Sequence, residues 1–269
     1  MPASLPMYDL PEVRDATDAW WAGIARHAGL SDLPPRLERP MELMAHWTAP
    51  DLLFSQTCGY PLTFGLAGKV RYLATPCYAA EGCMGPSYRS AVMVRDDAAM
   101  AGLADAQGKV AAINGPDSQS GCNVLRVMAA EAGDARPFFG EIRVTGSHVA
   151  SLQAVLDGRA DLAAVDCVTL GLLRRHRPKA LAGLRVLAWS PAAPGLPYIT
   201  GLDVPDARHA ALRRALKAAV ADPRLASVRR ALLIADIAIL DPDAYAVIPG
   251  MRRRAEALGL VELSLPDGG

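Results

Sequence analysis

The sequence has 269 residues, of which 51% are apolar and 21% are charged. This composition supports one large domain or two ordinary lobes with a sizeable core, and it excludes a largely disordered chain. Lys plus Arg and Asp plus Glu number 28 each, so charge gives no reason to expect nucleic acid or an acidic membrane as a partner. The longest apolar runs, such as "ALLIADIAIL", are too short for membrane insertion.

The amino-terminal segment and the cysteines bear on compartment and cofactors. "MPASLPMYDLPEVRD" lacks the basic and apolar regions of a secretory signal, so the sequence as written predicts a cytoplasmic protein, or a periplasmic one whose leader has been lost. The five cysteines form no CxxC pair and no zinc-like spacing with histidine, so neither a metal nor a cofactor is expected. Cys77 and Cys83 could form a local disulfide, although two separate thiols are the commoner outcome.

The first part of the chain predicts short strands around one helix. A strand is expected over residues 3–7. Asp9 and Glu12 then have the spacing of a capping box, which makes Asp9 the expected N-cap of a helix. The core-facing side chains of this helix recur at helical intervals: Leu10, Val13, Trp20, Trp21 and Ile24. Further strands are expected over residues 51–56 and 70–75.

Strands and helices alternate in the middle of the chain, which predicts an α/β protein with parallel sheets. Strands are expected over residues 88–97, 109–114, 141–146 and 160–166. Helices are expected over residues 98–108, over residues 122–133, and from a Ser147 cap to Gly158. The proline-rich segment "WSPAAPGLPYIT" is expected to connect two lobes and to lead into a mainly helical carboxyl-terminal part.

Five polar clusters follow predicted strands directly, where open α/β sheets bind their ligands. If the sheets are parallel, the clusters converge on one or two walls of a crevice. They are Tyr8, Gln56 to Gly59, Asp117 to Cys122, Ser147 with His148, and Asp166.

The stretch "NGPDSQSGCN", residues 114–123, could cap a helix, hold a nucleophile or bind an anion. A strand-to-helix turn leaves the first N–H groups of the helix unpaired, and the helix dipole favours an anion there. The hydroxyls of Ser118 and Ser120 can donate as well, and Gly121 would let an oxyanion approach the backbone. Equally, either serine could simply cap the helix. Asp117 counts against an anion unless its carboxylate is turned away.

The other clusters also leave alternatives open. His148 is a capping or surface residue, or a neutral donor at a helix start. Asp166 is bonded to nearby backbone N–H groups or kept for a donor group of a ligand. Tyr8 is a rim aromatic or a core edge, and Cys58 is a packed small residue or a wall of the cleft.

Catalysis is not the expected role of these residues. Ser120, His148 and Asp166 form a notional triad, but the sequence has no G-x-S-x-G elbow. Cys58 and His148 would form a notional dyad, but "QTCGY" matches no nucleophile signature.

Four segments together resemble the phosphate/phosphite/phosphonate solute-binding protein family of ABC importers (PhnD-like). They are "YRSAVMVRDD", "LADAQGKVAAINGPDSQSG", "GSHVASLQAVLDGRADLAAVD" and "SPAAPGLPYIT". The resemblance implies a type II periplasmic-binding-protein fold in which each of two lobes has a mainly parallel sheet flanked by helices. Two crossing strands would join the lobes, with lobe 1 formed by residues 1–92 and 197–269, lobe 2 by residues 93–196, and the ligand in the cleft.

The resemblance also implies roles for particular residues. The oxyanion of a phosphonate or phosphate would be held by Ser118, Gln119, Ser120 and the backbone of Gly121 and Cys122. His148 and Asp166 would line the same lobe, and Tyr8, Thr57 and Cys58 would lie on the other. Gln119 stands where the family more usually has Ser or Thr, so the ligand is expected to differ there.

Three hypotheses follow for the whole protein. The first is a binding protein for a small anionic ligand that delivers it to an ABC-transporter permease. The second is a diverged cytoplasmic sensor or an enzyme on the same fold that uses Cys58 or His148. The third is a regulatory effector-binding protein, for which the sequence shows no DNA-binding region.

Overall fold

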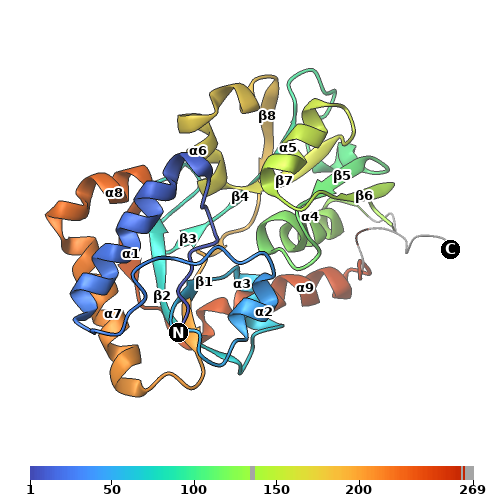
Figure 1. The fold of residues 1–269 in the computed structure, drawn as a ribbon. Helices are drawn as coiled ribbons and strands as arrows, with labels where there is room; N and C mark the ends of the chain where they lie inside the picture. The colour runs from blue at the N-terminus through green and yellow to red at the C-terminus, as the bar shows by residue number, and fades with distance from the viewer. Residues whose placement is uncertain (134–136, 262, 264–269) are drawn as a thin grey trace. The chain divides into compact units, whose positions relative to one another are not determined.

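The structure is a computed structural model that describes all residues except 134–136, 262 and 264–269. The chain divides into two compact units (Figure 1). Unit 1 comprises residues 1–87 and 194–244, and unit 2 comprises residues 88–193 and 245–269. Both units combine helices with a sheet, as the sequence predicts.

The division differs from the expected one at the carboxyl terminus. We expected residues 245–269 to belong with the first lobe, but the described part of this segment packs on unit 2 through helix α9 (Val247–Ala257). The side chain of Asn123 donates to the Ile248 carbonyl oxygen at 3.1 Å, and Arg254 lies 3.4 Å from Glu131. The chain therefore passes between the units a third time, in addition to the two crossings at 87/88 and 193/194 that are close to those expected.

The sheet of unit 1 has the strand order β1-β10-β2-β11. β10 (Tyr198–Gly201) and β11 (Ile234–Ala238) run in the same direction and are linked through α7 (Asp206–Ala221), η5 (Pro223–Leu225) and α8 (Ala226–Ala231). β2 (Val70–Tyr78) lies between them and is antiparallel to both, and β1 (Ser55–Gln56) is antiparallel to β10. The expectation of a mainly parallel sheet is therefore wrong for the named strands of this unit, because β2 separates the two strands that the helical connection makes parallel.

The first helix of unit 1 begins later than the sequence predicts. A short 3-10 turn, η1 (Pro11–Val13), precedes α1 (Arg14–Ala28), and no side chain caps either element. The Asp9 carboxylate instead accepts a hydrogen bond from Arg39 Nε at 2.8 Å. Pro11 has no N–H and a φ suited to the first helical position, so the helix starts without Asp9. The remaining helices of the unit are α2 (Leu43–Trp47) and α3 (Gly59–Thr63).

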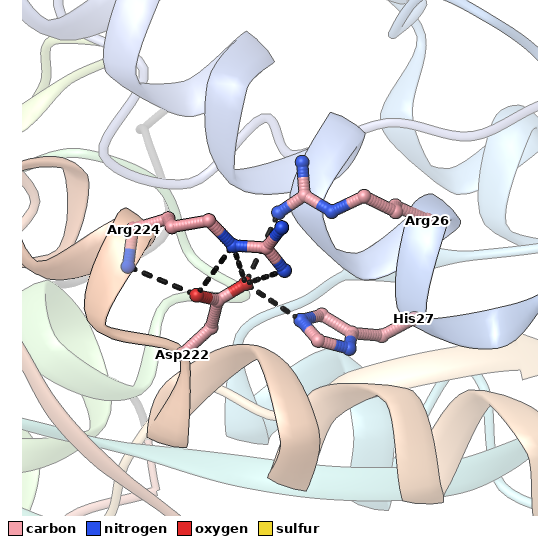
Figure 2. Close-up of polar contacts among 4 residues, drawn as sticks. All are labelled: Arg26, His27, Asp222 and Arg224. Atoms are coloured by element: carbon pink, nitrogen blue, oxygen red, sulfur yellow. Dashed lines mark hydrogen bonds and ion pairs between the residues drawn. The ribbon is translucent and has the colours of Figure 1, made fainter.

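A buried carboxylate fastens the ends of α1 and α7, which lie side by side (Figure 1). Asp222 follows α7, caps η5, and accepts hydrogen bonds from Arg224, Arg26 and His27, as Figure 2 shows. The hydrogen bonds from the Arg224 guanidinium hold the pKa of the Asp222 carboxyl far below its usual range. This cluster stabilises the packing of the two helices and explains why a charged side chain is buried there.

The sheet of unit 2 has the order β6-β5-β7-β4-β8, and four of these strands run in one direction. β5 (Val110–Ile113) is parallel to β6 (Glu141–Val144) and to β7 (Leu162–Asp166). β4 (Ser90–Arg95) is antiparallel to β7 and to β8 (Leu184–Trp189). A separate two-stranded ladder, β3 (Ser87–Tyr88) with β9 (Ala193–Pro194), lies at the two crossings.

Helices follow each parallel strand of unit 2. A π-helical turn, η3 (Gln119–Asn123), continues into α4 (Val124–Ala132). α5 (His148–Leu156) follows β6 and packs on β5 and β7, and α6 (Cys167–His176) follows β7. The expected helix over residues 98–108 is only the short turn η2 (Leu103–Ala106), because Asp105 accepts from the N–H groups of Ala101 and Gly102 and closes a turn there. The last short elements are η4 (Pro178–Leu181) and η6 (Pro242–Ala246).

Candidate functional site

Three helices of unit 2 begin at one edge of the sheet. β5, β6 and β7 are parallel, so their carboxyl ends lie at the same edge. A polar side chain caps the helix that follows each strand: Ser118 for η3, Ser147 for α5 and Asp166 for α6. This edge therefore combines three helix N-termini, each with a partial positive charge.

The serine turn, residues 118–121, forms the start of the first of these helices. Ser118 Oγ accepts a hydrogen bond from the Gly121 N–H at 3.0 Å, and the Asn123 N–H reaches the Ser118 carbonyl oxygen at 2.9 Å. Helix geometry leaves the N–H groups of Gln119 and Ser120 without an intrahelical acceptor. Asp117 is exposed and forms none of the contacts within the turn. Capping and anion binding are thus compatible here, because Ser118 satisfies one N–H group and leaves two.

A chain of short contacts joins the three helix starts. Ser120 Oγ lies 2.9 Å from His148 Nε2, and the same nitrogen lies 3.4 Å from Asp166 Oδ2. The side chains of His148 and Asp166 are only 11% and 4% exposed. Burial lowers the pKa of His148, while Asp166 and the Ala164 carbonyl oppose the shift. The lowered pKa favours the neutral imidazole next to Ser120, and the role of His148 as an uncharged donor stays a prediction.

Asp166 is mainly a cap of α6. Its Oδ1 accepts from the N–H groups of Val168 and Thr169 at 3.0 and 2.9 Å, and its Oδ2 accepts from the Thr169 hydroxyl at 2.5 Å. Of the two readings open from the sequence, backbone bonding is the one the contacts support. Sequence reasoning missed Thr169, although a threonine three residues after a capping aspartate is a recognisable signal.

Gln119 is not placed as the resemblance implies. Its side chain is fully buried, Oε1 accepts from Asn123 Nδ2 at 2.7 Å, and Nε2 contacts Met251 Sδ at 3.2 Å. Both polar groups of the amide are therefore used, one within η3 and the other in the contact between η3 and α9. The expectation that Gln119 alters ligand selection through its side chain is corrected: only its backbone N–H remains a candidate for ligand binding.

Gly121 and Cys122 also have other roles than expected. A Cβ on Gly121 would lie 1.9 Å from Asn114 Oδ1, so the side chain of Asn114 occupies the space expected for an oxyanion. The N–H groups of Gly121 and Cys122 donate to Ser118, because the π-helical turn satisfies them internally. The Cys122 side chain is buried beside Arg126.

Two of the candidates of unit 1, Tyr8 and Gln56, contact the side chain of Tyr78. Tyr8 has a φ of +64°, a strained value for a residue other than glycine, and its ring packs edge-on against Tyr78 at 5.3 Å. Gln56 donates to the Tyr78 hydroxyl at 3.0 Å. Thr57 is buried, with its N–H bonded to the Pro197 carbonyl, and Cys58 precedes α3 in an extended conformation. Strain of this kind is typical of functional positions, which supports Tyr8 rather than Thr57 as a binding residue.

The structure contains neither a metal cluster nor a membrane-spanning helix among the residues it describes. No group of three or more His, Cys, Asp or Glu side chains there could hold a metal ion. The described helices are all too short or too polar to cross a membrane. Cys77 and Cys83, which the sequence left open as a disulfide, are thiols, and burial raises the pKa of Cys77.

We expect acid to destabilise the protein below about pH 6.5. Burial lowers the pKa values of His46, His148 and His209 in the folded state below the ordinary histidine value of 6.5. Their contribution to stability is therefore complete above pH 6.5 and is lost as the pH falls towards the lowered values, because the unfolded chain then binds more protons. Thermal unfolding between pH 7.5 and 5.5 measures this loss of stability. The melting temperature of His148→Gln should depend less steeply on pH than that of the wild type. A melting temperature that rises on acidification would contradict it.

Comparison with protein families gives one match that covers most of the chain. Residues 51–245 match the family described as "ABC transporter, phosphonate, periplasmic substrate-binding protein". A search of curated proteins gave no significant match.

Several solved structures share the fold at low sequence identity. The phosphonate-transporter binding protein PA3383 of Pseudomonas aeruginosa is 17% identical with a TM-score of 0.75, over 96% of this chain and 87% of that one. PhnD1 of Prochlorococcus marinus in complex with methylphosphonate is 11% identical with a TM-score of 0.77, over 95% of this chain and 98% of that one. XAC2383 of Xanthomonas citri bound to ATP is 15% identical with a TM-score of 0.71, over 97% of this chain and 99% of that one. These likenesses confirm the expected type II periplasmic-binding-protein fold.

Proposed function

Because this chain belongs to the periplasmic phosphonate substrate-binding family of ABC transporters, a family of solute-binding proteins, we propose that its solute is a small phosphoryl oxyanion. The observation that carries this proposal is the serine turn beside His148, at an edge where three capped helices begin. Backbone N–H groups of Gln119 and Ser120, the hydroxyls of Ser118 and Ser120, and a neutral imidazole are all suited to donate to an oxyanion.

The ligands of similar proteins narrow the chemical class. PhnD1 holds methylphosphonate and XAC2383 holds ATP, and both ligands carry phosphoryl oxygens. A helix N-terminus with hydroxyl donors recognises those oxygens whatever group is attached to the phosphorus. We therefore assign the oxyanion to the serine turn of unit 2. Tyr8, Thr57 and Cys58 of unit 1 stay predictions as ligand-binding residues, with Tyr8 the strongest because of its strained backbone.

Binding without turnover is the activity that the geometry supports. In a Ser-His-Asp triad the serine and the aspartate bond to opposite ring nitrogens. Here both Ser120 and Asp166 approach Nε2 of His148. The Asp166 carboxylate is also occupied by the start of α6. We propose a transport role in the periplasm, with an ABC-transporter permease as partner, as the family description indicates.

Replacing Ser120 by alanine tests the assignment. We expect Ser120→Ala to weaken binding of methylphosphonate and phosphate about 10- to 100-fold, because it removes a hydrogen bond to a charged group. Isothermal titration calorimetry measures affinity, and the ligand-induced rise in melting temperature provides a second readout. Ser227→Ala, an exposed serine on α8, is the matched control.

The result that would overturn the assignment is specific. If Ser120→Ala binds both anions as tightly as the wild type, the serine turn is not the oxyanion site. ATP is included among the probes, since a nucleotide ligand would show the same dependence on Ser120 but a different affinity order.

A further inference from the structure

The first turn of α4 holds Arg126, a buried arginine with no place in the binding role described above. The residue is only 5% exposed, and its helix continues directly from the serine turn. Nη1 donates to Asn123 Oδ1 at 3.2 Å, and Nη2 contacts Cys122 Sγ at 3.7 Å. Both partners lie on the amino-terminal side of Arg126, so the guanidinium points back along the helix towards the serine turn.

The charge of Arg126 has no carboxylate partner within the described residues. Its Nε has no hydrogen-bond partner there either. Glu131, on the same helix, pairs instead with Arg254, and Glu256 of α9 pairs with Arg252. A guanidinium keeps its charge in proteins, and burying a charge without a counter-charge is costly. The buried charge of Arg126 therefore destabilises the folded protein, and an anion bound nearby would reduce this cost.

Buried amide contacts fix the direction of this guanidinium. Asn123 is fully buried, and its Nδ2 donates both to Gln119 Oε1 at 2.7 Å and to the Ile248 carbonyl oxygen at 3.1 Å. With both amide hydrogens used, Oδ1 is left to accept from Arg126. The contacts to Cys122 and Asn123 hold the charge beside the two residues that directly follow the serine turn.

The positive charge of Arg126 offsets a negative charge that lies close to the serine turn. Asp166 brings a negative charge to within 3.4 Å of His148, and an oxyanion bound at Ser120 would be repelled by it. His148 adds no positive charge while its imidazole is neutral. The helix N-termini supply partial charges only. The full positive charge of Arg126 near the serine turn therefore offsets the repulsion between the Asp166 carboxylate and a bound oxyanion.

We propose that Arg126 is the buried counter-charge for the oxyanion at the serine turn and that it makes the site prefer dianions to monoanions. This inference rests on the proposed function and names its substrate class: phosphonates and phosphate in their doubly charged forms. Arg126 acts through its electric field and through Asn123, so it is a positioning residue and not a ligand contact.

Methylphosphonate and methanesulfonate test this preference, because the two probes share a shape and differ by one charge at pH 8.5. We expect Arg126→Met to weaken methylphosphonate binding about tenfold or more and methanesulfonate binding much less, since only the dianion gains strongly from the charge. The melting temperature of ligand-free Arg126→Met should not fall, because the variant removes an uncompensated buried charge. Arg126→Lys should keep most of the preference. Arg254→Met, an exposed arginine on α9, is the control.

Four results would overturn the inference. One is unchanged preference between the two anions in Arg126→Met, which together with a lower melting temperature would assign Arg126 to folding alone. Another is an equal loss of preference in Arg126→Lys and Arg126→Met. If the wild type binds no phosphonate, phosphate or nucleotide, the proposed function fails and this inference fails with it; if the wild type binds them and Arg126→Met binds them equally well, only this inference fails.

Discussion

Gly121→Ala is expected to destabilise unit 2 by ~3 kcal/mol, the cost of forcing an extra carbon into a packed region, and to abolish oxyanion binding. The added Cβ would lie 1.9 Å from Asn114 Oδ1 and 3.4 Å from the Asn114 backbone nitrogen. A tightly packed site can relieve such an overlap only by moving side chains or backbone. Here the backbone that would move is the serine turn itself, so the Gln119 and Ser120 N–H groups would lose their alignment. Chemical denaturation and titration calorimetry measure the two effects.

Asn114 gives this prediction a sharp control. Its Oδ1 has no hydrogen-bond partner among the described residues, so truncating the side chain should cost little. In the double variant Asn114→Ala/Gly121→Ala the overlapping atom is gone, and most of the lost stability should return. The coupling energy of the double-mutant cycle should exceed ~1 kcal/mol. Gly102→Ala, where a Cβ meets nothing within 4 Å, should be nearly neutral. A Gly121→Ala variant as stable as Gly102→Ala would show that the overlap is not real.

The edge of unit 2 that bears the proposed site could be predicted from the sequence because its signals are local. A strand, a turn of small polar residues and a helix follow each other three times, at Ser118, Ser147 and Asp166. Parallel strands bring such turns to one edge, so the proximity of Ser120, His148 and Asp166 follows from topology. Which of two roles each residue has could not be decided from sequence, since capping and ligand binding use the same atoms.

The positions that were not predicted depend on partners far along the chain. Gln119 is buried because Met251, 132 residues later, lies against its amide. Asp9 does not cap the first helix as expected, because its carboxylate accepts a hydrogen bond from Arg39. The sheet of unit 1 departs from the parallel expectation because β2 lies between two strands that a helical connection makes parallel. Periodicity within a window contains none of this information.

Asp166→Ala is expected to cost about 2 kcal/mol of stability, because the start of α6 loses its cap. The side chain accepts from the N–H groups of Val168 and Thr169 and from the Thr169 hydroxyl, and removal leaves these buried donors unsatisfied. His148 also loses the carboxylate beside Nε2, so its ring is no longer held next to Ser120. Chemical denaturation should show this loss of stability.

Asp166→Asn removes the negative charge beside His148 but keeps an oxygen that can cap α6. The asparagine oxygen can still accept from the two backbone N–H groups, so most of the stability should remain. The negative charge that opposes the burial of His148 is gone, and the pKa of His148 should fall further. An NMR titration of the imidazole protons measures this shift, with Asp97→Asn, an exposed aspartate after β4, as the control. If the pKa of His148 stays unchanged in Asp166→Asn, the two side chains are not coupled. His148 would then be oriented mainly by its contact with Ser120, and the proposed anion site would depend on Asp166 only through the start of α6.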